Sequence, residues 1–196
     1  MTQTNTTPQP PRTPETPQAT ATLKNKEITV SSPENIEELA NRGYGTKQNK
    51  KLTLAYYEAL YLQSKSIIQV QQAKPKKTLN FQQLLDQYKA HDPNAWAKYL
   101  IYRDLRSRGY IIREGFGLGT DFRMYERGEY GTATAKYLIY GIQEGQPITM
   151  ESLAQTLKTA HSQKKELVLA VLNRRGEVVH YTLSRLTLKK KQLPQE

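Results

Sequence analysis

The order of apolar and polar residues predicts alternating strands and helices over the stretch 27–72. Short apolar runs bounded by turn-forming residues indicate strands, and apolar residues that return every three or four positions indicate a helix face. Ser32 and Pro33 fit the N-cap and the first position of a helix. The predicted strands cover 28–30, 52–54 and 67–70, and the predicted helices cover 32–39 and 55–63. This order predicts a small N-terminal α/β domain.

A second patterned stretch runs from residue 93 to 188 and changes its period at Gly109. Before this glycine the apolar residues return at helical spacing, with Asp92 as the expected N-cap, and after it they mostly alternate. The predicted strands cover 110–113, 121–125, 137–142, 166–172 and 177–188, with a helix at 149–162. We therefore expect a second domain with a mixed sheet flanked by helices.

The remaining segments carry few residues that a core would bury. Residues 1–26 are mostly Thr, Pro and Gln, so burial does not offset the entropy of ordering them, and we expect a disordered tail. Residues 73–92 are predicted to form a basic linker and a helix at 81–88, and residues 189–196 a short basic tail. The whole sequence thus predicts a mixed α/β protein of two small domains.

Composition points to an anionic partner. Lys and Arg number 29 against 18 Asp and Glu, and the formal net charge of +11 favours nucleic-acid binding. The chain has no cysteine, which excludes disulfides and thiolate metal sites. It has neither an apolar run of ~20 residues nor a signal-peptide pattern, so we expect a cytoplasmic protein without a membrane partner.

Two local patterns resemble ligand sites but lack the context that such sites need. The glycine-rich segment 115–119 leads into a predicted strand, whereas a dinucleotide-binding loop leads into a helix. The histidines are His91, His161 and His180, and none has metal-ligand spacing to another. We expect His161 to be packed on an apolar helix face. No metal or cofactor site is predicted.

One group of carboxylates leaves a metal-dependent nuclease open as an alternative. Asp121, Glu126 and Glu129 lie close together in the sequence, and Lys165 and Glu166 precede another predicted strand. Such a nuclease needs clustered carboxylates that hold a divalent cation at the scissile phosphate. Chelation of the cation would abolish its activity.

Several ordered motifs carry a resemblance to a known family. They are RGYG (42–45), LTLAYYEALYL (52–62), YRDLRSRGYII (102–112), GLGTDFRMY (117–125), AKYLI (135–139) and AHSQKKELVLA (160–170). In this order they resemble the N-terminal and catalytic domains of archaeal tRNA-splicing endonucleases. The resemblance covers nearly everything from residue 28 to 188, and it implies a subunit of the enzyme that removes introns from precursor tRNA.

The resemblance implies RNA cleavage without a metal ion. In this family a tyrosine activates the ribose 2′-hydroxyl, which attacks the adjacent phosphate and leaves a 2′,3′-cyclic phosphate and a 5′-hydroxyl. Tyr125 matches that tyrosine. Lys165, or else Lys164, matches a lysine that stabilises the charge on the pentacoordinate phosphate. Electrostatic stabilisation of this kind is commonly the largest catalytic effect.

The sequence departs from the family at the third catalytic residue. A histidine that protonates the leaving oxygen normally precedes the Ala-x-Tyr-Leu stretch, and this chain has Thr134 there. A threonine hydroxyl is a poor acid at neutral pH, and losing a general acid typically costs ~10²–10⁴ in rate. Three explanations stay open: a non-catalytic subunit of a heteromeric enzyme, a catalytic subunit that uses water or another group, or an engineered substitution.

The resemblance also implies how RNA and other subunits are contacted. The family recognises a bulge–helix–bulge in precursor tRNA with cationic side chains that grip a flipped base, and Lys158 and Arg185 are the candidates here. Its members work as assemblies of four units, so this single unit implies a homo- or heterotetramer of related subunits. An acidic loop of one subunit docks on another, and Glu144 is the match.

Overall fold

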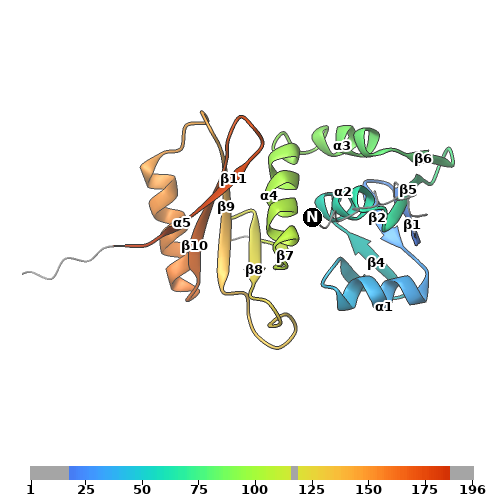
Figure 1. Ribbon diagram of the computed structural model, residues 1–196, viewed down its shortest axis with the longest axis horizontal. Coiled ribbons are helices and arrows are strands. Elements are labelled where there is room, and N and C mark those ends of the chain that lie inside the picture. Colours follow the sequence, from blue (N-terminus) through green and yellow to red (C-terminus); the bar gives the residue numbers. More distant parts are fainter. Residues whose placement is uncertain (1–17, 116–118, 186–196) are drawn as a thin grey trace, which may run out of the picture. The chain divides into compact units, whose positions relative to one another are not determined.

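The computed structural model describes residues 18–115 and 119–185 of the 196. They form two compact units that divide between Tyr88 and Lys89 (Figure 1). Each unit has one mixed sheet with helices, so the mixed α/β class predicted from the sequence is confirmed. No helix in these ranges is long and apolar enough to cross a membrane. Residues 1–17, which are predicted to be disordered, and the predicted basic tail 189–196 lie outside the described residues.

The N-terminal unit has a six-stranded sheet in the order β3-β4-β2-β1-β5-β6. β1 and β5 are parallel, and the other neighbouring pairs are antiparallel. Helix α1 contacts β3 and β4, and α2 contacts β5. The elements are β1 Ala19–Lys24, β2 Glu27–Val30, α1 Pro33–Asn41, β3 Thr46–Gln48, β4 Lys51–Leu54, α2 Tyr56–Ser64, β5 Ile68–Gln72, β6 Lys77–Leu79 and α3 Phe81–Lys89.

The prediction of disorder up to residue 26 is wrong for β1. Ala19, Ala21 and Leu23 alternate with polar residues, and they are 6%, 0% and 5% exposed. β1 lies between β2 and β5 and pairs with both. Alanine and threonine carry little hydrophobic signal in a sequence, whereas a central strand buries even small side chains and satisfies its backbone groups on both sides.

The predicted end of the first domain at residue 72 is also misplaced. β6 pairs with β5 inside the stretch expected to be a linker, and α3 follows it directly. Leu84 and Leu85 of α3 are buried, and Tyr88 stacks on Tyr56 of α2 with 5.0 Å between the ring centroids. These contacts make β6 and most of α3 part of the N-terminal unit.

The C-terminal unit has a five-stranded sheet in the order β11-β10-β9-β8-β7. β9 and β10 are parallel and are joined through α5, and the other neighbouring pairs are antiparallel. The elements predicted for this half are confirmed in type and order. They are α4 Ala95–Ser107, β7 Ile111–Glu114, β8 Phe122–Tyr125, β9 Tyr137–Gln143, α5 Met150–Ser162, β10 Glu166–Leu172 and β11 Val178–Leu183.

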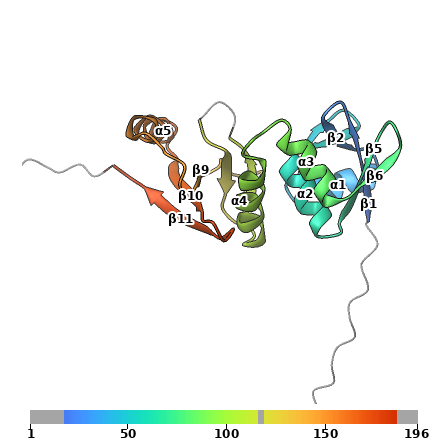
Figure 2. The ribbon, with the colours of Figure 1, turned by 90° about the horizontal axis from the view of Figure 1, so that it is seen from above.

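Helices α4 and α5 lie on opposite faces of this sheet (Figure 2). Gly141 of β9 faces α4 so closely that an added Cβ would lie 2.7 Å from the side chain of Ile101. On the other face, Leu138 of β9 packs with Ala160 of α5 and Leu167 of β10. The two-residue period of a strand therefore assigns neighbouring residues of β9 to different helices.

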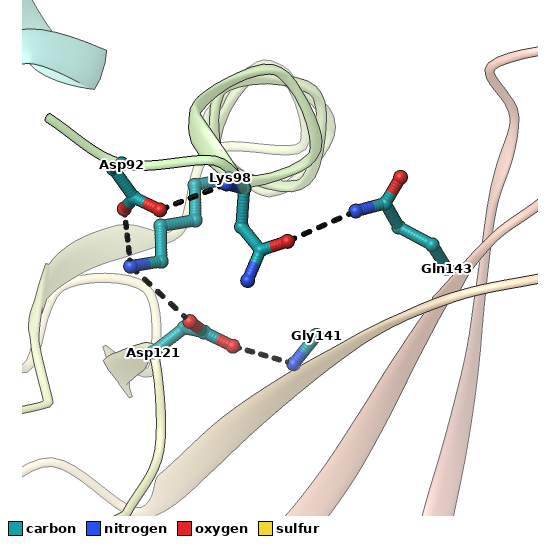
Figure 3. A network of polar contacts seen from close by, with 6 residues as sticks. Asp92, Lys98, Asp121, Gly141 and Gln143 are labelled. Atoms are coloured by element: carbon teal, nitrogen blue, oxygen red, sulfur yellow. Dashed lines mark hydrogen bonds and ion pairs between the residues drawn. The ribbon is translucent and has the colours of Figure 1, made fainter. Parts of the chain in front are cut away.

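A polar network positions the start of α4, and Asp92, the predicted N-cap, is part of this network (Figure 3). Asn94, and not Asp92, is the N-cap of α4. The Asp92 carboxylate accepts the Asn94 backbone N–H at 2.8 Å and so closes a turn before the helix. Lys98 donates to Asp92 at 2.6 Å and lies 3.7 Å from Asp121. Asp121 accepts the backbone N–H of Gly141 at 2.7 Å. The network thus ties α4 to the start of β8 and to β9.

Candidate active site

The register of the C-terminal sheet brings Tyr125 and Lys165 to the same end of the sheet. β8 is antiparallel and β10 is parallel to β9, and both Met124 and Glu166 lie opposite Tyr137. One step beyond these pairs, Tyr125 and Lys165 are level with each other on either side of β9. Their backbones are two strand spacings apart, roughly 10 Å.

Lys165 is anchored against the segment that leads into β9. Its ammonium group donates a hydrogen bond to the carbonyl oxygen of Ala135, which is itself buried. Its backbone N–H donates to the carbonyl of Ala160 in the last turn of α5 at 2.9 Å. Lys164 is exposed and lies in the turn with a φ of 54°. The hydrogen bond to Ala135 thus directs Lys165 toward the segment that carries Thr134.

Tyr125 is the last residue of β8 and is half-buried. Its ring meets the ring of Tyr130 edge-on, with 5.0 Å between centroids and 90° between planes. Such aromatic pairs restrict ring orientation and add ~0.5–1.5 kcal/mol beyond simple burial. Tyr130 lies in the loop between β8 and β9, which has no periodic pattern, so the sequence analysis missed it.

Thr134 lies in the same loop, directly before the carbonyl that Lys165 contacts. The loop folds back through hydrogen bonds from the N–H groups of Thr132 and Ala133 to the carbonyl of Glu129, at 3.1 and 2.9 Å. Thr134 is exposed, and its hydroxyl has no hydrogen bond to another described residue. The three predicted catalytic positions therefore lie at one end of the sheet, where β8 ends and β9 and β10 begin.

A charged cluster that the sequence analysis missed lies at the same end of the sheet. Glu126 accepts hydrogen bonds from the ammonium group of Lys136 at 2.9 Å and from the Tyr137 hydroxyl at 2.8 Å. The hydrogen bond from Lys136 lowers the pKa of Glu126 and raises the pKa of Lys136, so both groups are charged at neutral pH. Glu126 and Lys136 are ten residues apart in the sequence and come together because β8 pairs with β9. No helix or strand period brings residues at this spacing together, so the sequence pattern does not predict the contact.

The candidate RNA-binding residues are exposed on separate elements. Lys158 lies on α5, the helix that ends beside Lys165. Arg185 follows β11, and since Leu183 lies opposite Leu167, continuing this register by two residues brings Arg185 level with Lys165. Neither Lys158 nor Arg185 has a hydrogen bond or ion pair to another residue in the described ranges.

Glu144 lies at the opposite end of the sheet, just after β9. Its backbone N–H donates to the carbonyl of Leu172 at 2.8 Å, and its carboxylate accepts the backbone N–H of Arg174 at 3.1 Å. The side chain remains exposed. Glu144 is thus separated from the predicted catalytic positions, and it orders the turn between β10 and β11.

The carboxylates of the metal-dependent alternative do not form one cluster: Glu126 and Glu166 lie 2.9 and 3.9 Å from the ammonium group of Lys136, and Asp121 lies apart from them. Asp121 precedes β8, whereas Glu126 follows its end. Burial raises the pKa of Asp121, and the hydrogen bond from Gly141 and the charge of Lys98 oppose this shift. Over residues 18–115 and 119–185, no group of three His, Asp or Glu side chains has the geometry to hold a metal ion.

The prediction for His161 is wrong, because its side chain is exposed in the last turn of α5. The helix instead buries Thr156 and Ala160, whose side chains face the sheet. His180 is half-buried on β11 with its Nε2 3.8 Å from the carboxylate of Asp104, and burial lowers the pKa of His180. Its neighbour across the sheet is Ala170, far along β10 from Lys165.

Comparison with known proteins gives one family for both units. The family described as tRNA intron endonuclease, N-terminal domain, matches residues 19–85, and the tRNA intron endonuclease catalytic C-terminal domain matches residues 95–181. A tRNA-splicing endonuclease of Methanococcus vannielii is 35% identical over 168 residues, which are 86% of this chain and 94% of that protein. A tRNA-splicing endonuclease of Pyrococcus furiosus is 34% identical over 141 residues, 72% of this chain and 80% of that protein.

Proposed function

Because this chain belongs to the tRNA intron endonuclease family, we propose that it is a subunit that cleaves precursor tRNA at bulge–helix–bulge splice sites. Cleavage leaves 2′,3′-cyclic phosphate and 5′-hydroxyl ends and requires no metal ion. The observation that carries this proposal is that Tyr125 and Lys165 lie level with each other on either side of the segment that leads into β9.

Tyr125 is the base in this proposal. As a phenolate it takes the proton of the ribose 2′-hydroxyl as that oxygen attacks phosphorus, and the edge-on ring of Tyr130 keeps the Tyr125 ring in one orientation. Lys165 stabilises the negative charge that builds up on the phosphate oxygens. Glu126 offsets the charge of Lys136, whereas no carboxylate of the described ranges pairs with Lys165, so its charge is available to the phosphate.

Lys158 and Arg185 are the proposed contacts to the bulged bases. Both side chains are exposed and end in cations without a partner in the described ranges, and both elements lead toward Lys165. A guanidinium group stacks on a base through its planar face, whereas an ammonium group does so more weakly. Arg185 is therefore the stronger of the two proposed base contacts.

Thr134 favours a second candidate function, a non-catalytic subunit of a heteromeric enzyme. A threonine hydroxyl does not protonate a leaving oxygen efficiently at neutral pH. In the first candidate function, water reaches the exposed loop and supplies the proton, so cleavage is slow. In the second, a related subunit with a histidine at this position cuts the RNA. If Thr134 is instead an engineered substitution for the histidine, Thr134→His is expected to restore full activity.

We expect the purified chain to cleave a bulge–helix–bulge RNA slowly in the presence of a chelator. The rate is measured under single-turnover conditions. The product ends are identified by their gel mobility before and after phosphatase treatment. A cyclic phosphate resists the phosphatase until acid opens the ring. An RNA with a 2′-deoxyribose at the cleavage site is expected to stay intact, because the attacking hydroxyl is missing.

A second RNA, in which both bulges are closed by base pairs, controls for general ribonuclease activity. Equal cleavage of both RNAs would contradict recognition of the bulge–helix–bulge. Activity that disappears with chelator would favour the metal-dependent alternative. Tight binding without cleavage would favour the non-catalytic subunit.

We further propose that four related units assemble, and we expect sedimentation to report a homotetramer. The edge strand β11 carries Val179 and Tyr181, which are 45% and 56% exposed and would be buried by a neighbouring subunit. Four copies of the 22.5-kDa chain have a mass of about 90 kDa. Glu144→Lys is expected to lower the tetramer fraction, with Glu151→Lys as a control on another exposed carboxylate. A monomer would contradict the homotetramer and favour a heteromeric enzyme.

A further inference from the structure

We infer that the N-terminal unit carries a second RNA contact, a pocket that binds phosphate groups of the RNA backbone. The pocket lies where β1 and β5 end and has a volume of about 390 Å³. Three lysines and three side-chain amides line it: Lys24, Lys26, Lys74, Asn25, Gln72 and Gln87. The identity of the ligand as RNA rests on the proposed function.

Parallel pairing of β1 with β5 builds this pocket from two distant segments. Leu23 lies opposite Gln72, and the N–H of Ala73 donates to the carbonyl of Leu23 at 2.9 Å. The two strands lie side by side in both views (Figures 1 and 2). Asn25 and Lys26 form the tight turn to β2, with φ values of 48° and 69°. Hydrogen bonds on both sides therefore fix the backbone that presents the lysines.

The pocket gathers positive charge that no carboxylate in its lining offsets. Glu27 lies opposite Lys24 in the β1–β2 pair, but its carboxylate accepts a hydrogen bond from the Thr53 hydroxyl at 3.0 Å. The ammonium groups of Lys24, Lys26 and Lys74 make no hydrogen bond or ion pair with a described residue, and no Asp or Glu lines the pocket. In the same unit Lys47 is instead paired with Glu37 at 2.7 Å. Three like charges around one hollow repel one another, and a bound anion relieves that repulsion.

The lining favours a phosphate backbone over a base or a small aromatic ligand. Its side-chain cations and amides donate hydrogen bonds, whereas it contains no aromatic ring or guanidinium on which a base would stack. Lysine is a point charge that suits phosphate oxygens in many orientations. The pocket is therefore expected to bind RNA regardless of base sequence.

The test is the binding of a precursor tRNA transcript by the triple variant Lys24→Gln/Lys26→Gln/Lys74→Gln, measured in chelator at several salt concentrations. We expect the affinity to fall by about tenfold or more, because each lost phosphate contact removes counterion release. The slope of log affinity against log salt is expected to decrease by about 2–3. Arginine at the same three positions keeps the charge and is expected to retain both the affinity and the slope.

The matched control is Lys50→Gln/Lys51→Gln/Lys65→Gln, which removes the same charge from exposed positions of the same unit. The inference is overturned if both triple variants bind alike, or if affinity falls without a change in slope. A change in sedimentation of the pocket variant alone would overturn it in favour of an acidic segment of another subunit. Binding without cleavage by the parent chain would leave the pocket standing and contradict only the proposed catalytic role, whereas no binding by the parent would overturn both.

Discussion

Lys165→Ala is expected to slow cleavage of a bulge–helix–bulge RNA by about 10²–10³-fold with little change in RNA affinity. The ammonium group lies against the carbonyl of Ala135 and has no carboxylate partner in the described ranges, so the structure holds a full positive charge beside the segment that carries Thr134. Such a charge acts mainly on the transition state, because the phosphate gains negative charge only as the 2′-oxygen attacks. Single-turnover rates at saturating protein measure the effect on the chemical step.

Lys164→Ala is the matched control for this variant. It removes the same charge one residue away, from an exposed turn, and is expected to change the rate less than about threefold. Thermal unfolding of both variants checks that the loss of the bond to Ala135 has not unfolded the C-terminal unit. If Lys164→Ala slows cleavage strongly and Lys165→Ala does not, Lys164 is the residue that stabilises the phosphate charge. If both variants slow cleavage equally, the cause is a general loss of attraction between the protein and the RNA.

Thr134→His is expected to accelerate cleavage by about 10²–10⁴-fold below neutral pH. An imidazolium group donates a proton to the leaving oxygen far better than water or threonine. Thr134 is exposed and has no hydrogen bond to another described residue, so the larger ring is accommodated without loss of a contact. The gain is expected to disappear as the pH rises through about 6.5, because the imidazolium loses its proton there. Rate measurements from pH 5 to 8 test both the size and the direction of the effect.

Two neighbouring variants separate a proton donor from a general change in the loop. Thr134→Ala is expected to keep the slow rate of the parent, since water remains the acid. Thr132→His places a histidine in the same exposed loop and is expected to give little gain. No acceleration by Thr134→His, together with intact RNA binding, would mean that Tyr125 and Lys165 are not placed for cleavage. The chain would then be a non-catalytic subunit.

Strong local patterns predicted the C-terminal unit well, whereas weak ones left gaps in the N-terminal unit. β9 and β10 carry long apolar runs between clear turns, and β10 buries residues on both faces. β1 has alanine and threonine where such a run would have leucine or valine, and all three residues of β3 are exposed. Neither strand has a pattern that marks it, so only pairing with neighbours makes them part of the sheet.

The identity of the candidate catalytic residues came from ordered motifs, but their convergence came from strand register. Tyr125 and Lys165 are far apart in the chain and become level only because β8 and β10 both pair with β9. The same pairing creates the cluster of Glu126, Lys136 and Tyr137 at the same end of the sheet. Neither arrangement has a spacing that a sequence pattern reveals.

The sequence by itself determined the mixed α/β class, the basic charge and the family, and it indicated the candidate catalytic positions Tyr125, Thr134 and Lys165. These properties depend on the chemistry of single residues and on periods of two to four residues, which a linear pattern records. Only the tertiary structure decided the central place of β1 and the basic pocket where β1 and β5 end. It also decided that Lys165 is directed toward the segment that carries Thr134. Those features depend on which distant segments pair and in what register, and that choice is made by the summed burial and hydrogen bonding of the whole sheet.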